Sequence, residues 1–140
     1  MFEYDPTSSP LRRKDCRHGN FTYYAADNPI GQSMAEYGEW AEAEVALFTR
    51  FVRPGDSVVE AGSNIGIHTL ALARMVGPAG LVYAFEPMAC NNQLLNANII
   101  ANGLTNIRSY QMACGETNEI MQFPQVWPDH QNNFGAFGLY

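Results

Sequence analysis

The clearest pattern of apolar and polar positions lies between residues 57 and 113, where short apolar runs alternate with segments of helical spacing. The runs at 57–61, 81–85 and 107–113 have the length and apolar content of buried strands. The segments at 65–76 and 87–101 repeat apolar residues three and four positions apart, which predicts helices. Alternating strands and helices predict an α/β fold with a parallel sheet, right-handed crossovers and the strand order 3-2-1.

The pattern is weaker on both sides of this region. Residues 1–35 mix prolines, glycines and polar residues, so we expect an irregular leader or flap with at most a short strand at 21–24. Apolar residues at helical spacing from Glu36 to Val52 predict a first helix, which Pro54, Gly55 and Asp56 end. The periodicity fails after Gly115. We therefore predict a leader at 1–35, a Rossmann-like cofactor-binding domain at 36–115, and an irregular tail of the same domain at 116–140.

Composition is that of an ordinary globular protein, because 46% of the 140 residues are hydrophobic and only 16% are charged. The net charge of -6 argues against nucleic-acid binding, which needs lysines and arginines to neutralise phosphates. The one basic run, Arg12-Arg13-Lys14 followed by Arg17, lies in the unpatterned leader. We interpret it as a solvated loop.

Three cysteines, at positions 16, 90 and 114, form no CxxC pair and build no disulfide framework. We expect reduced thiols and no metal site. There is no run near the roughly 20 apolar residues that cross a bilayer, and no signal-peptide pattern at the N-terminus. The expected protein is soluble and cytoplasmic, with no membrane partner.

A glycine-bounded turn follows the first predicted strand. Ligands of open parallel sheets bind at the carboxyl ends of the strands, near the point where the strand order reverses. Gly62 and Gly66 permit a tight turn there and let a ligand approach backbone N–H groups. This position predicts a nucleotide-like ligand.

Two carboxylates flank this turn along the sequence. Glu86 ends the second strand, 20 residues after Gly66, where it can accept both hydroxyl hydrogens of a ribose, and no local helix requires its charge. Glu60 precedes the turn, and a buried carboxylate at a strand end needs a specific partner. It suits the ammonium of a methionine moiety better than a pyrophosphate.

A dinucleotide such as NAD or FAD is the alternative ligand. The G-x-G-x-x-G fingerprint starting at Gly62 requires glycines at positions 64 and 67, where this chain has Asn64 and Ile67. An anionic pyrophosphate would also be repelled by Glu60. The sequence therefore favours a methyl donor over a dinucleotide.

Several strings resemble the FkbM-type methyltransferases. They are VVEAGSNIG at 58–66, HTLALA at 68–73, VGPAGLVYAFEP at 76–87 and NGLTNI at 102–107, with RHGNF at 17–21, YGEW at 37–40 and NFG at 133–135. The resemblance implies a class I fold that binds S-adenosylmethionine. It also implies methyl transfer to a hydroxyl oxygen of a sugar or another small-molecule or glycan acceptor.

Carried over by position, the resemblance assigns cofactor-binding roles to residues of two motifs. The first motif contains Glu60, Gly62, Ser63, Asn64 and Gly66, and the second contains Glu86 and Pro87. Thr69 either binds the cofactor carboxylate or is a buried helix residue, and Met88 either packs on the adenine or belongs to the core. No catalytic residue is assigned, and we interpret His68 as a packed or solvated side chain.

The chain departs from the family after its third strand. Family members continue into a fourth strand with a lysine-any-aspartate-any-glutamate-glycine motif, which does not occur before Tyr140. We therefore expect a truncated chain that lacks a complete acceptor site. The first strand would then have an unpaired edge, which the tail could cover or through which two chains could pair. An inactive, self-associating cofactor-binding module is thus a third hypothesis.

Overall fold

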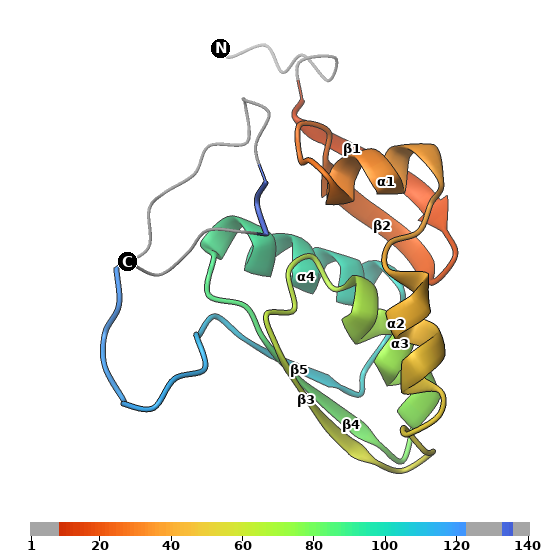
Figure 1. Ribbon diagram of the computed structural model, residues 1–140, viewed down its shortest axis with the longest axis vertical. Coiled ribbons are helices and arrows are strands. Elements are labelled where there is room, and N and C mark those ends of the chain that lie inside the picture. Colours follow the sequence, from red (N-terminus) through yellow and green to blue (C-terminus); the bar gives the residue numbers. More distant parts are fainter. Residues whose placement is uncertain (1–8, 123–132, 136–140) are drawn as a thin grey trace.

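Three parallel strands form the sheet of the computed structural model, which describes residues 9–122 and 133–135. They are β3 (Ser57–Ala61), β4 (Leu81–Phe85) and β5 (Ile107–Tyr110), in the order β3-β4-β5. The helices α3 (Ile67–Val76) and α4 (Ala89–Ala101) connect them and lie on one side of the sheet (Figure 1). The predicted α/β class and the strand order 3-2-1 are confirmed.

The core between sheet and helices explains why these segments form strands and helices. Val82 and Ala84 of β4 are fully buried, and their alternation places both side chains on the face that α3 and α4 cover. Leu72, Ala73 and Val76 of α3, Leu95 of α4 and Ile107 of β5 complete this cluster. The apolar residues that recur every two positions in the strands therefore pack in one core against those that recur at helical spacing in the connecting helices.

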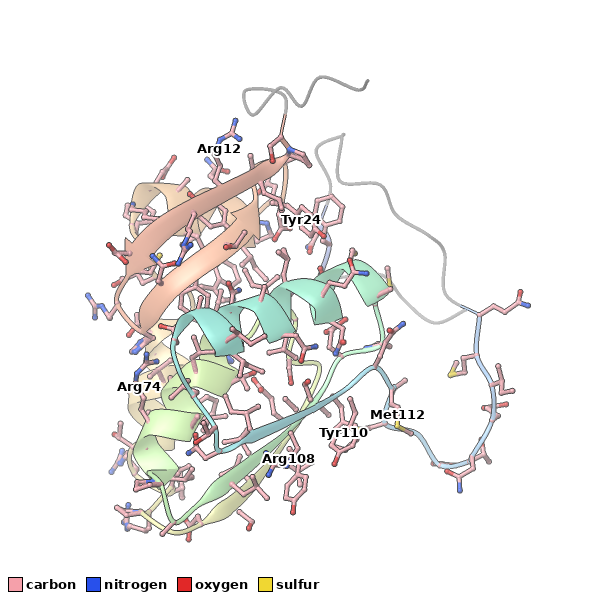
Figure 2. All side chains as sticks on the ribbon, turned by 180° about the vertical axis from the view of Figure 1, so that it is seen from behind. Arg12, Tyr24, Arg74, Arg108, Tyr110 and Met112 are labelled. Atoms are coloured by element: carbon pink, nitrogen blue, oxygen red, sulfur yellow. The ribbon has the colours of Figure 1, made fainter. Side chains whose placement is uncertain are left out.

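The expectation of an irregular leader at 1–35 is wrong for most of its described part, although the short strand expected at 21–24 is present. An antiparallel hairpin of β1 (Leu11–Cys16) and β2 (Gly19–Tyr24) is followed by α1 (Ile30–Glu36). Phe21, Tyr23 and Tyr24 are buried in a second core cluster with residues of α3 and α4. The run Arg12-Arg13-Lys14 lies on β1, not in a loop, and Figure 2 shows Arg12 on this outer strand.

Asn98 of α4 and the C-cap residue of that helix, Asn102, hold the hairpin against the sheet domain. The Asn98 side chain accepts a hydrogen bond from the Thr22 N–H (2.8 Å) and donates one to the Thr22 carbonyl (3.1 Å). Asn102 pairs in the same way with the N–H (3.0 Å) and carbonyl (2.7 Å) of Asn20. These amides take the place of a neighbouring strand along the edge of β2.

Other boundaries differ from the sequence prediction. Instead of one helix from Glu36 to Val52, α1 ends at Glu36 and α2 spans Glu42–Phe48, because Gly38 (φ 69°) and Ala41 (φ 52°) are left-handed. The second crossover helix begins at Ala89, not at Pro87, and the third strand ends at Tyr110, not at residue 113. Residues 116–122 have no helix or strand, as predicted for the tail. Within 9–122 and 133–135, no helix is long and apolar enough to cross a bilayer.

Candidate functional site

The turn between β3 and α3 is stabilised by its own backbone. The N–H groups of Gly62 and Ser63 both donate to the Phe85 carbonyl, at 2.8 and 2.9 Å. The Ile65 N–H donates to the Asn64 side chain at 2.7 Å, and the Gly66 N–H donates to the Ser63 carbonyl at 2.9 Å. These donors are already used, so the expectation that they would face a ligand is wrong. A ligand at this turn meets side chains and carbonyl groups instead.

The two glycines of the turn have different structural roles. Both are left-handed, with φ of 88° at Gly62 and 95° at Gly66. A Cβ atom on Gly62 would meet no atom within 4 Å, so this residue leaves open space at the turn. A Cβ atom on Gly66 would lie 2.7 Å from Cδ1 of Leu95, so Gly66 allows the turn to pack against α4. The first glycine therefore faces the site and the second serves the core.

Glu86 joins the turn to the start of α4. Its Oε2 accepts a hydrogen bond from the Asn64 N–H (2.8 Å), and its Oε1 accepts one from the N–H of Met88, the N-cap residue of α4 (2.9 Å). Glu86 therefore serves a local helix, α4, contrary to the expectation from sequence. Burial raises the pKa of Glu86, and the N–H groups of Met88 and Asn64 partly offset that increase.

Glu60 has its own hydroxyl donor. Thr69, fully buried on the first turn of α3, donates from Oγ1 to Oε2 of Glu60. Burial raises the pKa of Glu60, while the hydroxyls of Thr69 and Ser63 and the nearby His68 lower it. Thr69 is thus a buried helix residue whose hydroxyl bonds to a carboxylate of the protein itself.

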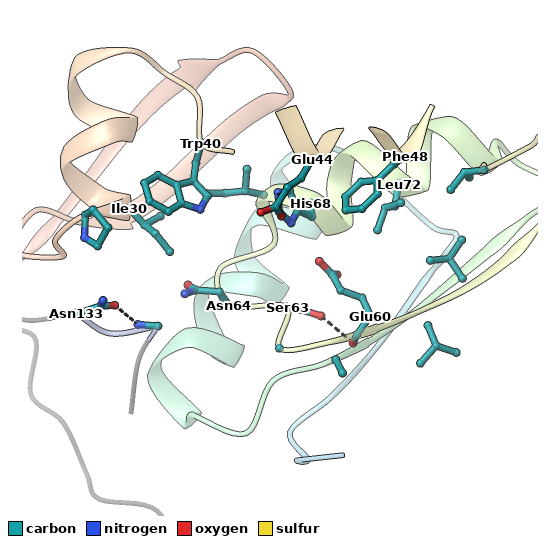
Figure 3. A pocket seen from close by; sticks show the side chains of 18 residues that line it. Ile30, Trp40, Glu44, Phe48, Glu60, Ser63, Asn64, His68, Leu72 and Asn133 are labelled. Atoms are coloured by element: carbon teal, nitrogen blue, oxygen red, sulfur yellow. Dashed lines mark hydrogen bonds and ion pairs between the residues drawn. The ribbon is translucent and has the colours of Figure 1, made fainter. Parts of the chain in front are cut away.

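Two adjoining pockets meet at the turn. A pocket of about 620 Å³ is lined by Glu60, Gly62, Ser63 and Asn64 among others (Figure 3). A smaller pocket of about 130 Å³ is lined by Gly62, Asn64, Glu86, Pro87 and Met88. The structure thus brings together most of the predicted site residues. Gly66 and Thr69 line neither pocket.

Residues 133–135 line one side of both pockets. Phe134 is buried, with its N–H donating to Asp27 (3.1 Å) and its carbonyl accepting from Asn91 (2.8 Å). Gly135 lines both pockets. The NFG string marked this segment, but nothing in the sequence linked it to Asp27 or Asn91.

The charge of the large pocket is negative. Its described lining contains the carboxylates of Glu44 and Glu60 and the imidazole of His68, and contains no lysine or arginine. Figure 3 shows these three side chains facing the same space. Such a lining attracts cationic groups and repels anionic ones.

Comparison with known proteins finds a partial sequence match to a methyltransferase. No family model matches it. A stretch of 66 residues is 38% identical to the catalytic subunit TRM61 of a tRNA (adenine(58)-N(1))-methyltransferase from Cryptococcus neoformans. The stretch covers 46% of this chain but only 15% of that protein.

Solved structures show the same fold. A SAM-dependent O-methyltransferase from Thermotoga maritima has a TM-score of 0.50 and 21% identity, over 74% of this chain and 41% of that one. A candidate rRNA methylase from Clostridium thermocellum has a TM-score of 0.50 and 23% identity, over 51% of this chain and 39% of that one. The chain therefore has the α/β fold of class I methyltransferases. The FkbM-type resemblance stays a prediction.

Proposed function

We propose that this chain binds S-adenosylmethionine across the turn between Glu60 and Glu86, as the cofactor-binding part of a methyltransferase. The observation that carries the proposal is the position of two carboxylates, the buried Glu86 and the half-buried Glu60, on either side of one turn whose amide donors are already bonded. The class I fold supports it, because ligands of such sheets bind at the carboxyl ends of the strands.

Glu86 fits the ribose end of the cofactor. Each of its oxygens accepts one backbone N–H, and the Asn91 side chain adds a third hydrogen bond, so about one of the four acceptor sites of the carboxylate is left for a ribose hydroxyl. The pocket beside it measures about 130 Å³. This is less than the roughly 300–1,000 Å³ of a whole ligand pocket, so the space would hold only part of the cofactor, and the rest would lie in the adjoining pocket.

Glu60 fits the cationic end. S-adenosylmethionine carries a sulfonium, which makes its methyl group electrophilic, and an ammonium, and both charges are attracted by a carboxylate. A pyrophosphate about 4 Å from Glu60 would instead be repelled by about 4 kcal/mol per charge pair at an effective dielectric constant near 20. The turn also has no spare N–H groups between residues 62 and 66 to compensate. These contacts support the methyl donor over NAD or FAD.

The acceptor is proposed as a hydroxyl of a sugar or another small molecule, as the FkbM-type strings imply. The absence of lysine and arginine from the described pocket lining supports an acceptor other than nucleic acid. On the protein side, Thr69 holds Glu60 in place and Glu86 fixes the turn to α4. No general base is assigned.

Titration calorimetry of the folded 140-residue chain tests the proposal. We expect binding of S-adenosylmethionine and of S-adenosylhomocysteine, and none of NAD. Glu86→Gln should weaken binding of both at least tenfold, because a carboxamide has a single acceptor oxygen and cannot accept from the Asn64 and Met88 N–H groups and from a ribose hydroxyl as well. Glu116→Gln, at an exposed glutamate, is the matched control and should bind normally. If folded protein binds neither ligand, the proposed function is wrong.

A further inference from the structure

The segment Asn133-Phe134-Gly135 reaches the two pockets from a part of the chain far from the sheet in sequence. Figure 1 shows this short dark-blue segment against the amino-terminal part of α4. Phe134 is only 1% exposed, and the centroid of its ring lies 5.3 Å from that of Tyr24 on β2. Because burial of an aromatic ring is strongly favourable, Phe134 anchors the segment in the core.

Two buried polar side chains hold the backbone of Phe134. Asp27, between β2 and α1, accepts a hydrogen bond from the Phe134 N–H at 3.1 Å. Asn91, on α4, donates to the Phe134 carbonyl at 2.8 Å. Asp27 is 3% exposed and Asn91 is 1% exposed, so both depend on protein partners rather than on water. Phe134 therefore has a fixed position relative to α1 and α4.

Asn91 connects Phe134 with the carboxylate that we assign to the ribose. Its side chain also hydrogen-bonds to Glu86. A side-chain amide has two N–H donors, so Asn91 can serve Glu86 and the Phe134 carbonyl at once. A displacement of Phe134 would therefore disturb one of the hydrogen bonds that position Glu86.

Gly135 approaches the glycine turn closely. It lines both pockets. A Cβ atom on Gly135 would lie 2.7 Å from Nδ2 of Asn64 and 3.5 Å from Cδ1 of Ile30. The Asn64 side chain is held in place, because its Oδ1 accepts from the Ile65 N–H at 2.7 Å. The segment can lie against the turn because residue 135 has no side chain.

Asn133 shapes the bend that brings Gly135 to the pockets. Its Oδ1 accepts a hydrogen bond from the Gly135 N–H at 3.1 Å, two residues along the chain, as in an Asx-turn. Figure 3 shows this bond as a dashed line, on the same side of the large pocket as Asn64. Each residue of the NFG string thus has its own role. Asn133 forms the bend, Phe134 is the anchor, and Gly135 permits the close approach.

We propose that residues 133–135 form a wall of the cofactor site and contact the adenosine part of S-adenosylmethionine. This inference rests on the proposed function, which puts the ribose at Glu86. Phe134 and Gly135 line the small pocket together with Glu86 and Met88. Because Phe134 is already anchored, the wall is in place before the ligand arrives, which lowers the cost of ordering it on binding.

Titration calorimetry with S-adenosylhomocysteine tests the anchor in the 140-residue chain. Phe134→Ala should weaken binding about tenfold or more, because the segment would then have to be ordered when the ligand binds. Phe134→Leu keeps a large apolar side chain and should bind within about threefold of wild type. Circular dichroism establishes that each variant is folded.

A pair of glycine variants tests the close approach. Gly135→Ala should weaken binding about threefold or more, because the new Cβ would displace the segment from Asn64. Gly115→Ala is the matched control and should bind as wild type does, since a Cβ there would meet no atom within 4 Å. If folded Phe134→Ala and Gly135→Ala both bind as tightly as wild type, this inference is wrong and the proposed function stands.

Hydrogen exchange separates contact with the ligand from a purely structural role. S-adenosylhomocysteine should slow exchange of the Phe134 and Gly135 N–H groups more than that of the Asn20 N–H, which is bonded to Asn102 at 3.0 Å in the hairpin. Equal slowing would overturn the inference, because the segment would then serve only the fold. Failure of folded wild type to bind the ligand would contradict the proposed function itself, and this inference with it.

Discussion

The side-chain amide of Asn98 pairs with both backbone polar groups of Thr22, 76 positions earlier in the sequence. It also donates to the Ile65 carbonyl at 2.9 Å, so one fully buried side chain joins β2, α4 and the glycine turn. Asn98→Ala leaves the backbone groups of Thr22 and Ile65 buried without hydrogen-bond partners, and each unpaired group costs about 1–3 kcal/mol of stability. We expect the free energy of unfolding to fall by about 2–4 kcal/mol, measured by urea denaturation.

The control for Asn98 lies on the exposed face of the same helix. Gln93→Ala changes a polar residue of α4 to alanine without removing a buried contact, so its effect should stay within about 0.5 kcal/mol. An Asn98→Ala variant as stable as Gln93→Ala would show that the asparagine pairs do not hold the hairpin.

Gly62 and Gly66 make a second matched pair. Both are left-handed, so alanine at either position carries a conformational cost of about 1–2 kcal/mol. At Gly66 the new Cβ would also overlap Leu95, which adds about 1–3 kcal/mol for overpacking. We expect Gly66→Ala to lower the urea midpoint clearly more than Gly62→Ala does. Equal effects would contradict the packing role of Gly66.

Glu60→Gln should increase the stability of the protein over that of wild type at pH 8 but not at pH 4. Burial raises the pKa of Glu60 above its ordinary value near 4.5. The folded state therefore binds more protons than the unfolded state between these two pKa values, and stability falls as the pH rises through them. Glutamine removes that cost and still accepts from Thr69. Thermal unfolding at both pH values measures the gain, which should vanish at pH 4.

The elements between Ser57 and Tyr110 could be predicted because each has a strong local period and buries its apolar residues in one core. The hairpin could not. β1 is mostly polar, and β2 obtains its edge hydrogen bonds from Asn98 and Asn102, which follow their partners by 76 and 82 positions. No local pattern reports a contact that depends on tertiary structure.

The candidate site shows the same limit. The sequence predicted that the residues around Gly62 and Glu86 would come together, because strand ends share one edge of a sheet. It did not predict that Glu86 would accept a hydrogen bond from the N-cap residue of α4, because that bond depends on where the helix begins. Nor did it connect Phe134 with Asp27, 107 positions apart, because only the folded chain brings them together.

Thr69→Val separates two roles for one hydroxyl. Valine keeps the buried, β-branched shape of Thr69 but cannot donate to Glu60. If Thr69 acts through Glu60, the substitution raises the pKa of that carboxyl further, because a bond that lowers it is lost while the burial remains. Affinity for S-adenosylmethionine should then fall about tenfold at low pH and recover as the pH rises and Glu60 ionises.

A double-mutant cycle completes this test by calorimetry. In a Glu60→Gln background, Thr69→Val should have little further effect on affinity, because the carboxylate that Thr69 positions is already gone. Direct contact between Thr69 and the carboxylate of the cofactor, which the sequence leaves open for this residue, predicts the opposite. The loss would then be the same in both backgrounds and independent of pH above 5. That result would show that Thr69 binds the cofactor directly and that the role of Glu60 does not depend on Thr69.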